Sequence, residues 1–194
     1  IQIFYGYNLD YFGEEVLAVG NRVMIVGSVQ YYEAGGTYQI ADIKYNAMDP
    51  TNEENIQLLG QGGSAAYQEM TADQLLHGTV ELEVESEDAI ETKSFDVGFL
   101  TMHSSASLKN LTIKEIYTTS NEDSSNKGAM SITCTDENGT TIVVRTAVLK
   151  DGNGNTITAS AFPIGSVIDA RGIVDVYNGV YQLKVFSASD IVVH

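Results

Sequence analysis

The chain has 194 residues and a formal net charge of −16, and its length suits one large domain or two small ones. Nucleic acids are bound mainly through Lys and Arg, but residues 1–90 hold only two basic side chains against 15 acidic ones. This balance makes the first half a poor candidate for binding nucleic acid. The sequence also contains no apolar run of about 18 residues, so it predicts no membrane-spanning helix.

The first predicted elements in chain order are strands at Ile1–Tyr7 and within Val23–Tyr45. Two short helices follow, at Asn52–Leu59 and at Thr71–Leu76. For the second helix, Thr71 is a good N-cap residue and Gly78 marks the stop. Apart from these two segments, the abundant Thr, Val, Ile and Tyr indicate strands joined by turns.

The middle of the chain adds two predicted strands, Thr79–Glu85 and Ser94–Met102. In the first of them, apolar and acidic residues alternate strictly, which is typical of a strand with one wet face. The two strands either pack onto the first-half sheet or form a separate arm. We expect packing, with three apolar side chains of the first strand buried: Val80, Leu82 and Val84.

The second half continues with predicted strands at Leu111–Thr119, Ala129–Thr135 and Thr140–Leu149. Asn138 and Gly139 between the last two suit a tight type I′ turn. A short helix or turn is expected at Ser160–Pro163. The single cysteine, Cys134, alternates with Met130 and Ile132 on the core face, which predicts a buried structural thiol.

One segment of the chain occurs twice. Aligning Gly20 with Gly165 places Val19–Ile40 on Ile164–Leu183, so that Gly27 falls on Gly172 and Tyr32 on Tyr177. Apolar residues alternate through both copies, and a glycine in the middle of a strand suggests a bulge or a sharp bend. The repeat therefore predicts the same β-hairpin twice, in a small closed barrel or in an ordinary sandwich.

The repeated pattern G-x-x-V-x-V-x-G-x-V-x-x-Y-x-G-x-Y-Q-[IL] resembles the last two strands of OB-fold modules from bacterial secreted and cell-surface proteins, a family labelled nucleic-acid-binding-like. In the second half the resemblance extends over most of a module, whereas the first half matches only from a late third strand onward. It implies an all-β chain of two OB-fold-like units, each a five-stranded Greek-key barrel. The first unit is then incomplete, or is completed by the middle segment.

The corresponding domains are residues 1–105, an OB-like unit with the acidic middle segment, and residues 106–194, a complete OB-fold domain. Gly172 is expected at a bend or bulge of the fourth barrel strand. The resemblance also implies an extracellular or cell-envelope location in bacteria.

Exposed tyrosines are the best binding candidates, because aromatic rings stack on sugars and dock protein partners. The candidate binding residues are Tyr5, Tyr7, Tyr32, Tyr177 and Arg145. The same tyrosines suit an alternative role as cross-strand pairs that close the barrel. The segments that match the second and third OB strands contain no aromatic residue, which argues against base stacking there.

No catalytic constellation is visible, since the three histidines are scattered and no Gly-rich phosphate loop precedes a helix. We therefore expect no enzyme, no metal and no cofactor. The favoured function is a non-catalytic binding or adaptor module of a secreted or envelope protein that engages a glycan or a protein. The alternative is a nucleic-acid-binding OB module attached to a larger nuclease or phosphatase. The oligomeric state stays open.

Overall fold

The structure, a computed structural model, describes residues 2–4, 15–33, 36–41, 56–85 and 89–194. The chain is mostly β, as the sequence predicts, and divides into two compact units, Ile1–Ala66 and Tyr67–His194. The boundary predicted from the sequence lies at residue 105 instead. The difference arises because the segment after Tyr67 pairs with the strands that follow it and contributes to their core.

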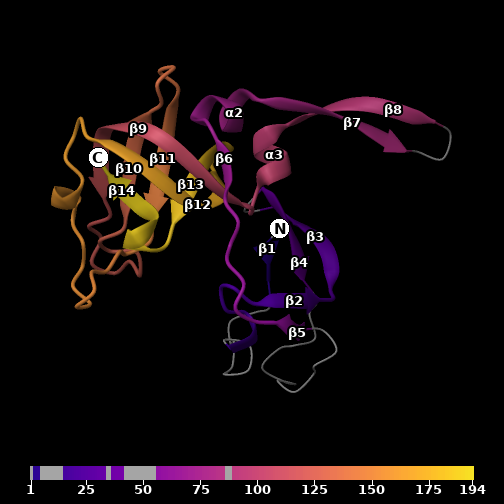
Figure 1. Cartoon of the computed structure of the whole chain (residues 1–194), viewed down its shortest axis with the longest axis horizontal. Coiled ribbons are helices and arrows are strands. Elements are labelled where there is room, and N and C mark those ends of the chain that lie inside the picture. The colour runs from indigo at the N-terminus through magenta and orange to yellow at the C-terminus, as the bar shows by residue number, and fades with distance from the viewer. Residues whose placement is uncertain (1, 5–14, 34–35, 42–55, 86–88) are drawn as a thin grey trace. The chain divides into compact units, whose positions relative to one another are not determined.

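The second unit is built on a closed five-stranded barrel with the strand order β9-β10-β11-β13-β12-β9 (Figure 1). Neighbouring barrel strands are antiparallel except β11 and β13, which are parallel. The short strand β14 pairs with β12 outside this ring, and β6 pairs with β9 in parallel. The strands are β6 (Gln68–Met70), β9 (Ser105–Thr118), β10 (Met130–Thr135), β11 (Thr141–Thr146), β12 (Val167–Tyr177), β13 (Val180–Val185) and β14 (Ile191–Val193).

Alternation along each strand fills the barrel with apolar side chains. In β10, Met130, Ile132 and Cys134 point inward and are fully buried, which confirms the structural role expected for the thiol. The short 3-10 helix η2 (Ala159–Ala161) lies where a short helix or turn was expected, and a second one, η3 (Ala188–Asp190), precedes β14. The turn between β10 and β11 is not type I′, because only Gly139 of its central pair has a positive φ, of 85°.

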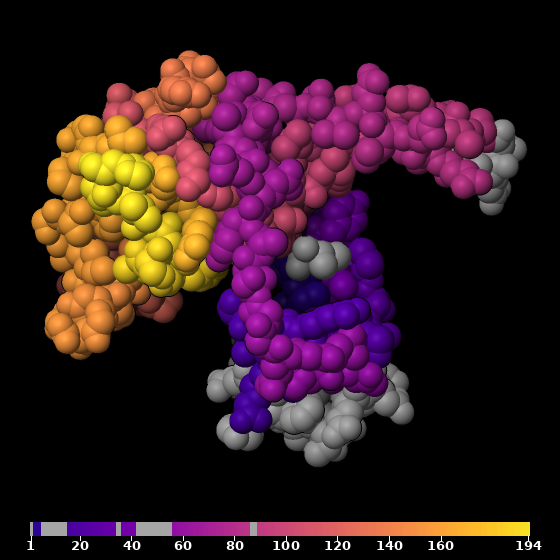
Figure 2. Space-filling model, viewed as in Figure 1, coloured from indigo at the N-terminus to yellow at the C-terminus, as the bar shows by residue number. Residues whose placement is uncertain are grey.

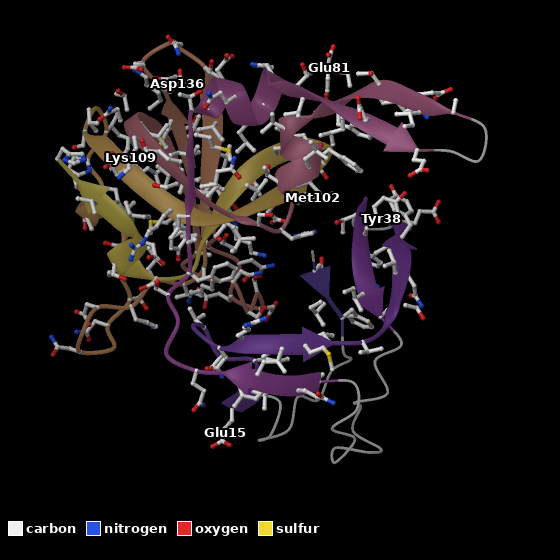
Figure 3. The ribbon with its side chains drawn as sticks, turned by 45° about the vertical axis from the view of Figure 1, so that its right-hand side comes forward. Glu15, Tyr38, Glu81, Met102, Lys109 and Asp136 are labelled. Carbon is white, nitrogen blue, oxygen red and sulfur yellow. The ribbon has the colours of Figure 1, made fainter. Side chains whose placement is uncertain are left out.

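Asp136 shapes that turn. Its carboxylate accepts hydrogen bonds from the backbone N–H groups of Asn138 and Thr140, and also from that of Asp73. Figure 3 shows Asp136 at the end of the barrel where α2 lies. The Asp136 carboxylate therefore stabilises this turn by accepting hydrogen bonds from backbone N–H groups within it.

Helix α2 (Ala72–His77) confirms the predicted helix and its cap. The Thr71 hydroxyl accepts from the N–H of Gln74, and the Gln74 side chain accepts from the N–H of Thr71, so both orphan donors are satisfied. The helix buries Ala72 and Leu75 in the barrel core. This burial ties the segment before the barrel to the barrel itself.

The middle segment forms a separate two-stranded hairpin of β7 (Thr79–Glu85) and β8 (Ile90–Asp96). It stands clear of the barrel in the space-filling view (Figure 2). Val80 and Leu82 are each 40% exposed and Val84 is half-buried, so the expected burial of this face is wrong. The second predicted strand ends at Asp96, and Val97–Thr101 forms the helix α3.

The first unit contains two small sheets. One has the order β1-β4-β3 and the other pairs β2 with β5. The second sheet corrects one prediction, because residues 56–59 of the expected helix lie in a strand. Its strands are β1 (Gln2–Ile3), β2 (Arg22–Ile25), β3 (Ser28–Tyr32), β4 (Thr37–Ala41) and β5 (Ile56–Gly60).

These sheets repeat the pairing of the last barrel strands residue by residue. The hairpin β3–β4 pairs Val29 with Ile40, and the hairpin β12–β13 pairs the aligned residues Val174 and Leu183. The parallel pair β1–β4 matches β11–β13, and the antiparallel pair β2–β5 matches β12–β14 in the same register. Among the described residues, the first unit has no counterpart of β9 and β10.

In its described part, the first unit buries its apolar side chains less completely than the barrel does. Val29 is 67% exposed, whereas its counterpart Val174 is fully buried in the closed barrel. Other apolar side chains of the first unit are only half-buried, while their barrel counterparts are buried. They are Ile3, Val23, Ile25 and Ile40, which match Val144, Ile168, Ala170 and Leu183.

Candidate functional site

A groove of about 500 Å³ crosses the outer face of the barrel. Its volume falls within the range of sites that bind small ligands. The groove takes side chains from all five barrel strands or from the segments that follow them, and none from the first unit. Its lining, which defines the barrel groove below, is Tyr117, Thr119, Asn126, Ser131, Arg145, Tyr177 and Gln182.

Strand register explains why three of these residues meet. Ser131 in β10 lies opposite Tyr117 of β9 on one side and opposite Arg145 of β11 on the other. The inward positions of these strands are taken by buried side chains such as Ile132 and Val144, so the three residues point outward. Since neighbouring strands lie about 4.8 Å apart, the row spans roughly 10 Å.

Arg145 is held in a fixed place by two hydroxyl groups. Its Nη1 donates to Ser131 Oγ at 3.1 Å and its Nη2 donates to Thr119 Oγ1 at 3.2 Å. Thr119 is itself fixed by backbone hydrogen bonds with Ala129 and Gly128 across the base of the β9–β10 loop. The guanidinium group is therefore preorganised at the floor of the groove.

Two exposed tyrosines line the groove. Tyr117 is 61% exposed and Tyr177 is 67% exposed. Tyr177 ends β12 and is followed by Asn178 and Gly179, whose φ angles of 50° and 77° match a type I′ hairpin turn. This tight turn holds the ring at the tip of the β12–β13 hairpin.

The negative charge of Asp175, beside the groove, is partly neutralised. Gln182 donates to Asp175 at 3.2 Å, and the Lys184 ammonium lies 3.9 Å from the same carboxylate. Lys184 also lies 5.7 Å from the centre of the Phe186 ring. Asp175 thus has two partners of its own, and neither of them is the Arg145 guanidinium.

Of the candidate residues named from the sequence, the structure brings Tyr177 and Arg145 to the same groove. Tyr32 lies in the first unit, at the hairpin tip that corresponds to Tyr177, and is exposed. Tyr5 and Tyr7 lie outside the described residues. The aligned counterpart of Arg145 in the first unit is Phe4, so the guanidinium group has no match at that position.

Sequence reasoning missed five lining residues, Tyr117 among them. The alternation of the predicted strand Leu111–Thr119 already places Tyr117 on its outer face, which was an available signal. Its neighbours in space depend on the pairing of β9 with β10 and of β10 with β11. The register of these pairs is set by contacts between residues far apart in the sequence, so the sequence of one strand does not predict it.

Two tyrosines of the first unit, in the sheet β1-β4-β3, pair with each other. The rings of Tyr31 and Tyr38 lie 5.1 Å apart at 57° as a cross-strand pair, and both are exposed. Figure 3 shows Tyr38 on this sheet. Such a tilted cross-strand pair stabilises a hairpin.

In the part of the chain that the structure describes, no group of three or more His, Cys, Asp or Glu side chains comes together to hold a metal ion. The loop that begins at Asp151 illustrates this. The Asp151 carboxylate accepts from the backbone N–H groups of Asn153 and Asn155 and from the Asn155 side chain, so it closes a hairpin loop. The described helices are also too short to cross a membrane.

No protein-family model matches the chain, and no curated protein matches it. The functional inference consequently depends on the chemistry of the barrel groove. That chemistry combines two exposed aromatic rings, a fixed guanidinium group, two amide side chains and two hydroxyl groups. Aromatic faces with nearby amides and hydroxyls can stack on a ring and bind its polar substituents.

Proposed function

We propose that the chain is a non-catalytic binding module of a secreted or cell-envelope bacterial protein, and that it binds a glycan through the barrel groove. The supporting observation is the convergence of Tyr117, Arg145 and Tyr177 on one groove. The rings supply stacking surfaces for a sugar, and the polar lining supplies hydrogen bonds to its hydroxyl groups.

The strand order supports an OB-type barrel as the scaffold. A five-stranded barrel in which the third and fifth strands run parallel has the topology that the sequence resemblance implies. OB barrels bind oligosaccharides and oligonucleotides on the face of their second and third strands, between the loops after the first and fourth. In this barrel these are β10, β11 and the loops that hold Asn126 and follow Tyr177.

The test is a titration of Tyr177→Ala and Tyr117→Ala against glycans that the parent protein binds on a glycan array. Loss of one stacking ring is expected to weaken binding roughly tenfold, which corresponds to about 1.4 kcal/mol. Tyr32→Ala is the matched control, because it removes an exposed tyrosine from the corresponding hairpin tip outside the groove. A parent that binds no glycan, or a Tyr177→Ala variant that binds as the parent does, would refute the proposal.

A second candidate is single-stranded nucleic acid, favoured by the placement of two tyrosines and one arginine on the face that OB barrels use for bases. The net charge of −16 opposes it, because phosphate binding needs a cationic surface. An oligothymidine of 15 nucleotides distinguishes the two ideas. We expect no binding at physiological salt, whereas an affinity that falls steeply between 50 and 200 mM salt would favour the nucleic-acid alternative.

A further inference from the structure

Lys150, an exposed side chain, donates to the Thr156 hydroxyl, and the half-buried Arg145 likewise has neutral partners. Its two hydrogen bonds go to the hydroxyls of Ser131 and Thr119, and no described carboxylate forms an ion pair with it. Five lysine and arginine side chains do pair with carboxylates in the described structure. These pairs are Lys93–Glu91, Lys109–Asp169, Lys127–Glu122, Arg171–Asp190 and Lys184–Asp175.

This arrangement is notable in a chain with 26 acidic and 10 basic side chains. Carboxylates are abundant, yet the half-buried guanidinium group at the floor of the groove has none. A guanidinium group has five N–H donors, and the two hydroxyl bonds occupy only two of them. The remaining donors are held in place and are available to an acceptor that enters the groove.

A carboxylate matches these donors best. Guanidinium and carboxylate groups are both planar, and they pair through two parallel hydrogen bonds that are stronger than neutral ones. A carboxylate also brings a single negative charge into a strongly acidic protein, whereas a phosphate brings up to two. The nearby Asp175 is already bound by Gln182 and Lys184, which limits its repulsion of such a ligand.

We infer that the barrel groove recognises an acidic sugar, with the carboxylate of a uronic or sialic acid residue on Arg145. This inference depends on the proposed glycan-binding function. Tyr117 and Tyr177 stack on the apolar faces of the sugar, and the amides of Asn126 and Gln182 are within the groove to bind its hydroxyl groups.

The experiment probes an array of uronic-acid, sialic-acid and neutral glycans with the parent chain. The glycans bound are expected to carry a carboxylate. Each bound glycan is then titrated beside its carboxyl methyl ester, which keeps the sugar and removes the charge. We expect the ester to bind at least tenfold more weakly, because it offers no charged acceptor to the guanidinium group.

Three variants test whether the preference for the acid over the ester depends on Arg145. Arg145→Gln is expected to lose the preference for acid over ester, and Arg145→Lys to keep a reduced preference because an ammonium group cannot pair bidentately. Lys114→Gln is the control, since it removes one exposed positive charge from β9 outside the groove and should leave the preference unchanged. The ester comparison uses the unaltered protein, so it stands even if an Arg145 variant folds poorly.

Failure of the inference and failure of the proposed function give different results. If neutral glycans bind as well as acidic ones, or the ester binds as well as the acid, acidic recognition is overturned while glycan binding stands. Unchanged acid preference in Arg145→Gln would overturn the assignment to Arg145. If no glycan binds at all, both ideas are overturned.

Discussion

At the scale of single residues, Gly172 shows how closely two barrel strands approach. A Cβ atom at this position would overlap the backbone carbonyl oxygen of Lys184 in β13, so no larger side chain fits. The expectation here was a bend or a bulge: the register shift of β12 falls between Ile168 and Ala170, so the bulge lies elsewhere, and a bend at Gly172 stays a prediction. The glycine is required by close backbone approach, which is the other common reason for a glycine within a strand.

We predict that Gly172→Ala destabilises the barrel by roughly 1–3 kcal/mol, because the added methyl group must push the two strands apart. Gly152→Ala is the matched control, since its Cβ meets no atom; its effect should stay within about 0.5 kcal/mol. Chemical denaturation followed by circular dichroism measures both changes. Equal stability of the two variants would show that β12 and β13 can separate at little cost.

Asp169 affects stability through the ionisation of its carboxyl group. Partial burial opposes ionisation of its carboxyl group, but the hydrogen bonds from the Asn110 N–H, Lys109 and His194 outweigh burial, so its pKa is lower than usual. A lowered folded-state pKa stabilises the protein above the ordinary aspartate pKa of about 4. This contribution is lost as the pH falls through the folded-state value.

We therefore predict that the free energy of unfolding of the parent falls more steeply below pH 4 than that of Asp169→Asn. The amide cannot ionise, so that variant should be less stable than the parent at neutral pH and closer to it in acid. Asp123→Asn, in an exposed loop, serves as the control and should follow the parent. Parallel pH curves for Asp169→Asn and the parent would show that these hydrogen bonds contribute nothing to acid stability.

At the scale of elements, the duplicated hairpin was the most predictable feature of the chain. Strand alternation and the paired glycines align the two copies, and the pairing registers of β3–β4 and β12–β13 follow that alignment. The helix α2 was predictable for a similar reason, because its capping box involves residues three positions apart. Both elements are determined by residues that lie close to one another in the sequence.

Other elements depend on contacts that a single segment does not reveal. The segment Ser94–Met102 mixes apolar and polar residues without a clear period, and the strand gives way to a helix at Val97. There Gly98 lies directly against the Tyr181 ring of β13, so a distant aromatic side chain specifies the close packing of α3. The barrel groove was hidden for the same reason, since its lining comes together only when all five barrel strands pair.

The matched positions of the two hairpins allow a direct test of the difference between the units. Val174→Ala should destabilise the barrel by roughly 1–3 kcal/mol, because it removes fully buried methyl groups and leaves a cavity. Val29→Ala, at the aligned and exposed position, should change stability by less than about 0.5 kcal/mol. Thermal and denaturant unfolding of the two variants measures this contrast. A large cost at Val29 would mean that the first unit is covered in solution.

At the scale of the whole molecule, the two units differ in the size of their cores. The core of the second unit combines residues of all five barrel strands with Met70 of β6 and Leu75 of α2. In the described part of the first unit, the buried cluster contains only Val16 and Ile56, with half-buried neighbours. Small sheets with little buried surface are marginally stable in water, so the second unit should supply most of the cooperative unfolding.

The folded barrel domain should begin at β6 and not at β9. Residues 67–194, expressed alone, should fold and unfold in a single transition, because this piece contains β6, α2 and all barrel strands. Residues 105–194 should be less stable by several kcal/mol, since Leu75 and Met70 are lost from the core and one Leu or Met truncation alone typically costs about 2–5 kcal/mol. Leu75→Ala within residues 67–194 provides the single-residue version of the same test. If the shorter piece unfolds at the same denaturant concentration as the longer one, β6 and α2 are attachments to a barrel that is complete without them.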